Sequence, residues 1–156
     1  FLSLEQDVIP PPNVLEQLLR HGKDVVAGIY VYPFKTQIVD QKKKVKVVKD
    51  MLIPMVSKPH PTDSKLMHPC TLQEVEGDQV FQIRGCGLGC VLIKRNVLEN
   101  ISFRFEGRDD AQNFSNDCWG KNITMYADTS VKCTHLIKNK PLWVKDLLNP
   151  KQESSQ

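Results

Sequence analysis

The chain has 156 residues, of which 40% are hydrophobic and 25% are charged, and its formal net charge is +3. These values indicate a globular domain with one core, and they exclude a collagen-like repeat and a disordered chain. The small net charge does not favour nucleic acid as a partner. No apolar run approaches the ~20 residues of a transmembrane helix, and no charged-then-apolar secretory leader precedes the first apolar run. Five cysteines, an odd number, favour free thiols in a reducing compartment. We therefore expect a cytoplasmic protein, with peripheral contact to a membrane as a further possibility.

The first third of the chain predicts a strand, a helix and a second strand. Residues 1–4 form an apolar run that suits a buried strand, residues 12–21 have helical apolar spacing, and residues 24–32 are rich in β-branched and aromatic side chains. Pro33 should end the second strand. Such alternation predicts an α/β fold, in which helices pack on the faces of a sheet.

Glu5 and Asp7 follow the first predicted strand directly. Period-two geometry places them on the same side, at the end of the strand where ligands bind in open α/β sheets. Two carboxylates this close favour a cation beside them. The alternative is an ordinary solvated turn.

The middle of the chain is less regular. Residues 34–72 contain a basic run, Lys42 to Lys49, that alternates with valines. Lysines on an edge strand or hairpin prevent unwanted strand pairing, and this interpretation is favoured over an anionic partner such as a phosphate or a membrane surface. Residues 74–83 predict a hairpin that turns at Gly77 and Asp78.

A glycine-rich segment, Gly85 to Gly89, precedes a strand at 91–95 and a helical segment at 96–100. Three glycines in five residues indicate a tight bend or a close approach of the backbone to a ligand, although the spacing is not that of a dinucleotide-binding loop. A helix should begin near Asp109 or Asp110, because acids are favoured at helix N-termini. Two short strands, at 123–127 and 131–136, and a brief amphipathic element at 141–148 follow. We treat 1–149 as one domain and 150–156 as a frayed tail.

The order of these motifs resembles the family 2 glycosyltransferases with the A-type fold. The resemblance extends from residue 1 to about residue 137. Five segments carry it, in the order typical of the family: Phe1–Pro12, Val25–Tyr30, Gly85–Arg95, Phe103–Glu106 with Asp109 and Asp110, and Tyr126–His135.

The resemblance implies a role for each segment. Glu5 and Asp7 correspond to the Asp-x-Asp motif that holds a divalent metal, Mn²⁺ or Mg²⁺, and the nucleotide-sugar donor, and His135 corresponds to the histidine that completes the metal site. Asp110 or Asp109 corresponds to the general base, with Asp110 favoured. Gly85 and Gly87 belong to a loop near the donor sugar and the acceptor.

We therefore predict a metal-dependent glycosyltransferase, inverting, that uses a UDP- or GDP-sugar and a glycan, lipid or protein acceptor. The predicted fold is the A-type α/β fold, a mixed central sheet with flanking helices. Relatives have an amino-terminal nucleotide-binding half before the Asp-x-Asp strand, and this sequence lacks it. The alternative function is a non-catalytic module that keeps the fold and binds a glycan, a protein partner or, through Lys42 to Lys49, an anionic polymer.

Overall fold

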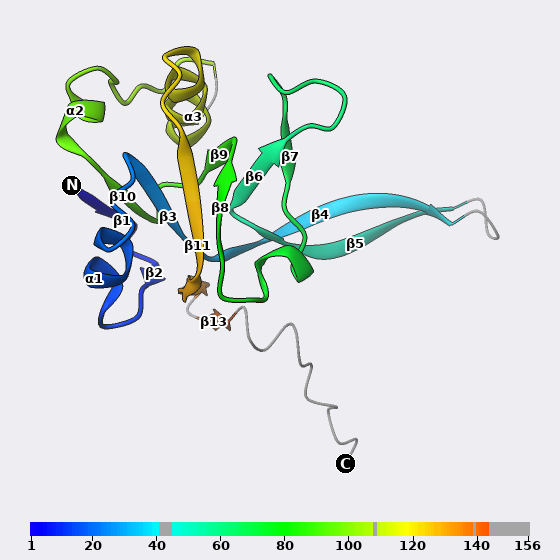
Figure 1. Cartoon of the computed structure of the whole chain (residues 1–156). Coiled ribbons are helices and arrows are strands. Elements are labelled where there is room, and N and C mark those ends of the chain that lie inside the picture. The colour runs from blue at the N-terminus through cyan, green and yellow to red at the C-terminus, as the bar shows by residue number, and fades with distance from the viewer. Residues whose placement is uncertain (41–44, 108, 139, 144–156) are drawn as a thin grey trace.

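The computed structural model describes residues 1–40, 45–107, 109–138 and 140–143 (Figure 1). The predicted tail at 150–156 and the end of the amphipathic element at 141–148 lie outside these residues. The described elements are, in chain order, β1 (Leu2–Leu4), β2 (Val8–Ile9), α1 (Val14–Leu19), β3 (Val25–Ile29), β4 (Val31–Asp40), β5 (Val45–Pro54), β6 (Val56–Pro59), β7 (Met67–Pro69), a 3₁₀ turn (Gln73–Val75), β8 (Val80–Ile83), β9 (Gly85–Cys86), β10 (Cys90–Ile93), α2 (Arg95–Leu98), α3 (Asp110–Gly120), β11 (Met125–Lys132), β12 (Thr134–Ile137) and β13 (Lys140–Trp143).

A five-stranded sheet with the order β1-β10-β3-β11-β8 lies at the centre. Only β3 and β11 run parallel, and the other neighbours are antiparallel. Every residue of β3 is buried, because the sheet has a hydrophobic cluster on each side. Val25 packs in the cluster that contains Phe114 of α3, whereas Val26 packs in the cluster that contains Leu18 of α1. Successive side chains of β3 point to opposite faces of the sheet, so this one strand contributes to both hydrophobic clusters.

Three smaller sheets surround the central one. They have the orders β13-β12-β2, β4-β5 and β7-β6-β9. The strands β4 and β5 form a long hairpin that extends away from the body of the molecule (Figure 1). The hairpin expected for the basic region is therefore present, while the role of its lysines stays a prediction. The side chains of Lys42 to Lys49 lie outside the described residues.

The predicted α/β fold is wrong. The described chain is mainly β-structure divided among several small separate sheets, and its α-helices have only six, four and eleven residues. The strand and helix periodicities are local signals, and they do not determine how many sheets the strands join. Instead of the single layered sheet that the sequence predicts, the described strands pair in several separate sheets.

Several element predictions also need correction. The first strand is half-exposed at its ends, since β1 is an edge strand with β10 as its one described neighbour. Pro33 does not end a strand but lies inside β4, where it pairs with Leu52. A two-stranded ribbon leaves one edge of β4 without a described strand, so a residue without an N–H is tolerated there. The hairpin predicted around Gly77 is instead a 3₁₀ turn followed by β8, which pairs with β11.

Other predictions are confirmed within the usual shift of element ends. The helix predicted at 12–21 is α1, and the helix predicted near Asp109 is α3. The five cysteines are all free and buried. Within the described residues, no helix combines the length and apolar character needed to cross a bilayer.

Candidate functional site

Glu5 and Asp7 lie in a tight turn between β1 and β2, and not on an extended strand. The N–H of Val8 donates to the carbonyl oxygen of Glu5 at 3.1 Å, which closes the turn. The N–H of Glu5 donates to the carbonyl oxygen of Gly89 at 3.2 Å. Glu5 is therefore hydrogen-bonded through its backbone to the glycine-rich segment, although more than eighty positions separate them in sequence.

The pairing of β2 with β12 brings Asp7 to His135. Val8 is the register partner of His135, and the N–H of Leu136 donates to the carbonyl oxygen of Asp7 at 2.7 Å. These backbone contacts place Nε2 of His135 3.4 Å from Oδ2 of Asp7. Two residues that the sequence assigned to one metal site are thus in contact.

A second contact fixes the orientation of the imidazole of His135. Its Nδ1 lies 2.7 Å from the carbonyl oxygen of Val31, which accepts a hydrogen bond from this nitrogen. The ring is buried, and the Tyr30 ring packs edge-on against it with centroids 5.3 Å apart. With Nδ1 donating to this carbonyl, Nε2 faces the Asp7 carboxylate. This is the arrangement that metal-binding histidines commonly adopt.

The pKa of the Glu5 carboxyl is shifted by the same group of residues. Partial burial raises its pKa most, the negative charges of Asp7 and Asp110 raise it further, and His135 acts in the opposite direction. Glu5, Asp7, Asp110 and His135 are therefore electrostatic neighbours, although they come from three distant parts of the sequence. An excess of carboxylates that raises the pKa of one member is a condition that a bound cation would relieve.

The donor chemistry of this cluster fits Mn²⁺ or Mg²⁺, which prefer carboxylate oxygens and accept an imidazole nitrogen. Among the described residues, however, no group of three or more His, Cys, Asp or Glu side chains is arranged to hold a metal. Asp7 and His135 touch, while Glu5 joins them through its charge and not as a third ligand at bonding distance. Two of the three predicted ligands are therefore in contact, but the described residues do not form a metal site.

Asp109 and Asp110 begin α3. Oδ1 of Asp109 accepts the backbone N–H of Gln112 at 2.7 Å, which makes Asp109 the N-cap of the helix. Oδ1 of Asp110 accepts the N–H of Ala111 at 2.9 Å. Asp109 and Ala111 line a cavity, and Asp110 interacts with Glu5, so the pair connects this cavity with the acidic cluster.

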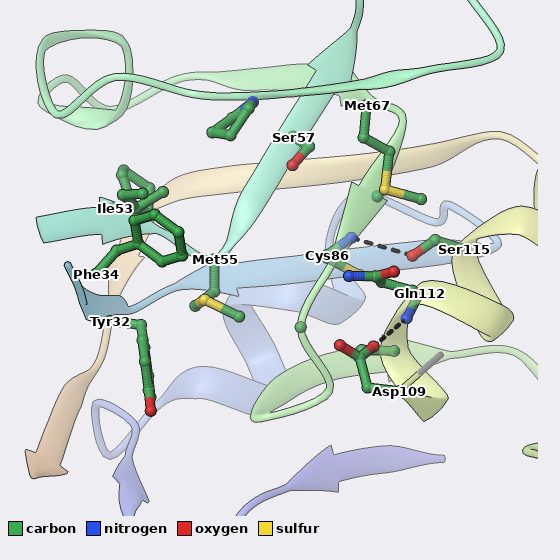
Figure 2. Close-up of a pocket in the computed structure, with 15 residues that line it drawn as sticks. Tyr32, Phe34, Ile53, Met55, Ser57, Met67, Cys86, Asp109, Gln112 and Ser115 are labelled. Atoms are coloured by element: carbon green, nitrogen blue, oxygen red, sulfur yellow. Dashed lines mark hydrogen bonds between the residues drawn. The ribbon is translucent and has the colours of Figure 1, made fainter. Parts of the chain in front are cut away.

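The cavity has a volume of about 520 Å³, within the range of small-molecule sites. Figure 2 shows Asp109, Gln112 and Ser115 of α3 on one side and Tyr32, Phe34 and Ile53 of the β4–β5 hairpin on the other. Gly85 and Gly87 also line it, as does Cys86. Burial raises the pKa of the Cys86 thiol to about 12, so this cysteine is not a thiolate nucleophile near neutral pH.

The glycines of the loop have a packing role in addition to lining the cavity. A Cβ at Gly85 would lie 2.7 Å from Sδ of Met67, and a Cβ at Gly87 would lie 2.1 Å from Oη of Tyr30. Oη of Tyr30 accepts the N–H of Gly89 at 3.1 Å. The loop therefore has no room for larger side chains at these positions, because Met67 and the buried Tyr30 occupy the space beside it.

We compared the chain with known proteins. No family model matches it, and no curated protein matches it. The crystal structure of A197 from STIV, a viral protein, superposes with a TM-score of 0.51 at 23% sequence identity, over 91% of this chain and 60% of that one.

At this identity the likeness to A197 shows the fold alone. This chain spans about three fifths of the length of A197. The likeness to A197, together with the small separate sheets, takes the place of the A-type glycosyltransferase fold that the sequence predicts. It assigns no activity to the chain.

The residues that sequence reasoning missed are the apolar residues of the cavity and the buried Tyr30. Tyr32 and Phe34 alternate across Pro33, and both are about half exposed. This alternation was a usable signal of a strand with aromatic side chains on one face. Pro33 conceals this alternation, because a proline is expected to end a strand.

Proposed function

We propose that the protein is a metal-dependent glycosyltransferase that moves a sugar from a UDP- or GDP-sugar to an acceptor hydroxyl with inversion. The observation that supports this proposal is the convergence of Glu5, Asp7, Asp110 and His135 beside a cavity lined by Asp109 and Gly87. The sequence motifs indicated each of these residues separately. Their proximity is an independent argument, because separate sheets and a helix position them.

In this proposal Glu5, Asp7 and His135 form the donor side. Their carboxylates and the Nε2 nitrogen would hold Mn²⁺ or Mg²⁺, and a bound metal supplies a Lewis acid for the departing diphosphate. The hydrogen bond from His135 to Val31 keeps the imidazole in the orientation that this role needs. Glu5 must be ionised to take part, and its pKa is raised, so donor binding should weaken as the pH falls through that pKa.

Asp110 is the proposed general base. In the sequence it lies between Asp109 and Ala111, which both line the cavity. Its negative charge raises the pKa of Glu5 on the donor side. A base must contact the acceptor hydroxyl while that oxygen attacks the sugar carbon attached to the diphosphate. Asp109 has the different task of capping α3, which orients the first turn of the helix and hence Asp110.

The acceptor is a glycan, a lipid or a protein hydroxyl. We place the reaction in the cytoplasm, with peripheral membrane contact as an option, because all five cysteines are free thiols.

Thermal unfolding with Mn²⁺ and either UDP or GDP tests the donor side. We expect Mn²⁺ plus the correct nucleotide to raise the Tm, and Asp7→Ala to abolish the increase. Asp78→Ala is the matched control, because Asp78 is an acid that is 81% exposed in its side chain and lies outside the cluster. If no nucleotide raises the Tm of the wild-type protein, the enzyme proposal fails and the non-catalytic module is favoured.

Donor hydrolysis or transfer tests the base. Asp110→Asn should lower turnover by at least ~100-fold, the contribution of a general base. Asp109→Asn should have a much smaller effect, because asparagine is an equally good N-cap. A large loss in Asp109→Asn with normal turnover in Asp110→Asn would reassign the base.

A further inference from the structure

The cavity beside α3 has two chemically different walls. The wall formed by α3 presents polar groups, namely the Asp109 carboxylate, the Gln112 amide and the Ser115 hydroxyl, and the last of these already accepts the N–H of Cys86 at 3.3 Å. The opposite wall is formed by the base of the β4–β5 hairpin and the strands after it. Its apolar members are Tyr32, Phe34, Ile53, Pro54, Met55, Met67 and Pro69.

The apolar wall is unusual because its aromatic members are not covered by the protein. Tyr32 is 49% exposed and Phe34 is 54% exposed, and both belong to β4 at positions two apart. Figure 2 shows them across the cavity from Asp109. Aromatic rings and methionine thioethers make favourable contacts with another ring. These side chains therefore offer a surface for an apolar ligand group.

The charges around the cavity limit what that ligand carries. Among the described residues that line the cavity, none is Lys or Arg, while Asp109 contributes a carboxylate and Asp110 adjoins it. A phosphate or carboxylate on the ligand would be repelled by these carboxylates and would meet no Lys or Arg among the described lining residues. The cavity thus favours a neutral molecule.

We infer that the cavity is an acceptor site for a neutral molecule that carries an aromatic or short alkyl group next to its reactive hydroxyl. This inference rests on the proposed function and names its acceptor class. The apolar group packs against Tyr32, Phe34 and Met55, which directs the hydroxyl to the polar wall of α3. The hydroxyl oxygen forms a bond to the sugar carbon, its proton passes to Asp110, and the electron pair of the breaking carbon–oxygen bond leaves with the nucleoside diphosphate.

Binding of model glycosides tests this inference without the natural substrate. We would measure the affinities of phenyl β-D-glucoside, octyl β-D-glucoside below its micelle concentration, methyl β-D-glucoside and phenyl phosphate by calorimetry or ligand-observed NMR. Phenyl glucoside should bind at least ~10-fold more tightly than methyl glucoside, because burial of a ring has about that effect or more. Phenyl phosphate should bind more weakly than phenyl glucoside. The octyl arm distinguishes an alkyl from an aryl source of the apolar group.

Two variants locate the binding to this cavity. Phe34→Ala and Tyr32→Ala should each weaken phenyl glucoside at least ~3-fold and leave methyl glucoside within twofold. Both side chains are half-exposed, so neither substitution should impair folding. Leu19→Ala is the matched control, because Leu19 is 56% exposed on α1 and does not line the cavity.

The donor assay on the same samples separates two kinds of failure. Equal affinities for phenyl and methyl glucoside, with stabilisation by Mn²⁺ and a nucleotide retained, would overturn the inferred acceptor class and leave the proposed function intact. The same is true if the two variants bind phenyl glucoside normally. If no nucleotide stabilises the wild-type protein, the proposed function is overturned together with the acceptor role of the cavity.

Discussion

Gly87→Ala should strain the packing between the glycine-rich segment and Tyr30. The new Cβ would lie 2.1 Å from Oη and 3.0 Å from Cζ of Tyr30, a side chain that is 2% exposed. Because Tyr30 is enclosed, either its ring or the loop must move, and overpacking of this kind typically costs about 1–3 kcal/mol. Movement also weakens the hydrogen bond from Gly89 to Oη, which contributes about 1 kcal/mol. We expect a total loss of about 2–4 kcal/mol in the free energy of unfolding.

Urea denaturation of four variants measures this loss and identifies its cause. Gly77→Ala is the control, because a Cβ there meets no atom within 4 Å. Tyr30→Phe removes the atom nearest to the new methyl group, so the double variant Gly87→Ala, Tyr30→Phe should lose at least ~1 kcal/mol less than the sum of the single losses. The reasoning is refuted if Gly87→Ala is as stable as Gly77→Ala, or if the two losses simply add.

Two further predictions concern stability. Oδ2 of Asp128 lies 2.6 Å from Nε2 of His21, and the Asp128 carboxylate also accepts from Arg20 and Ser130, so hydrogen bonds and the His21 charge overcome burial and hold its pKa below the usual value. A depressed folded-state pKa stabilises the protein above the unfolded-state value of about 4, and this contribution is lost as the pH falls through the folded-state value. Asp128→Asn should therefore lower the free energy of unfolding at pH 7 by about 1–3 kcal/mol, and the difference from wild type in chemical denaturation should shrink below pH 4. A constant difference from pH 7 to pH 3 would show that ionisation is not the cause. Phe114→Ala should cost about 3–5 kcal/mol in urea denaturation, because Phe114 is fully buried and stacked on Phe103. A loss below ~1 kcal/mol would mean that the core collapses around the gap.

Local signals predicted the elements whose causes are local. The helix that begins at Asp110 has an aspartate at its N-cap and buries Phe114 and Cys118, residues that recur at helical spacing. The alternation of lysine and valine in the basic run indicates a hairpin or an edge strand, and β4 pairs with β5. These features depend on neighbours within a few residues, so composition and period are sufficient to find them.

The remaining parts of the fold depend on distant partners. A residue with a Cβ does not fit at position 87 because Tyr30 lies beside it. Asp7 is held in place because β2 pairs with β12. The sequence contains no local mark of either contact. The number of sheets is likewise decided by which strands meet, and for this reason the alternation of strand and helix led to the wrong fold class.

The glycosyltransferase proposal does not depend on the rejected fold prediction, because function resides in a site and not in an architecture. Asp7 and His135 touch through the pairing of β2 and β12, while Glu5 is connected to the glycine-rich segment through Gly89. Asp110 reaches the same cluster from the start of α3. A solvated surface turn would explain two acids one residue apart, but it gives no reason for a buried, oriented histidine beside them or for a third carboxylate that raises the pKa of Glu5. The proposed cation-binding role would account for all four residues, and Asp7→Ala, with Asp78→Ala as its control, is the variant that separates the two explanations.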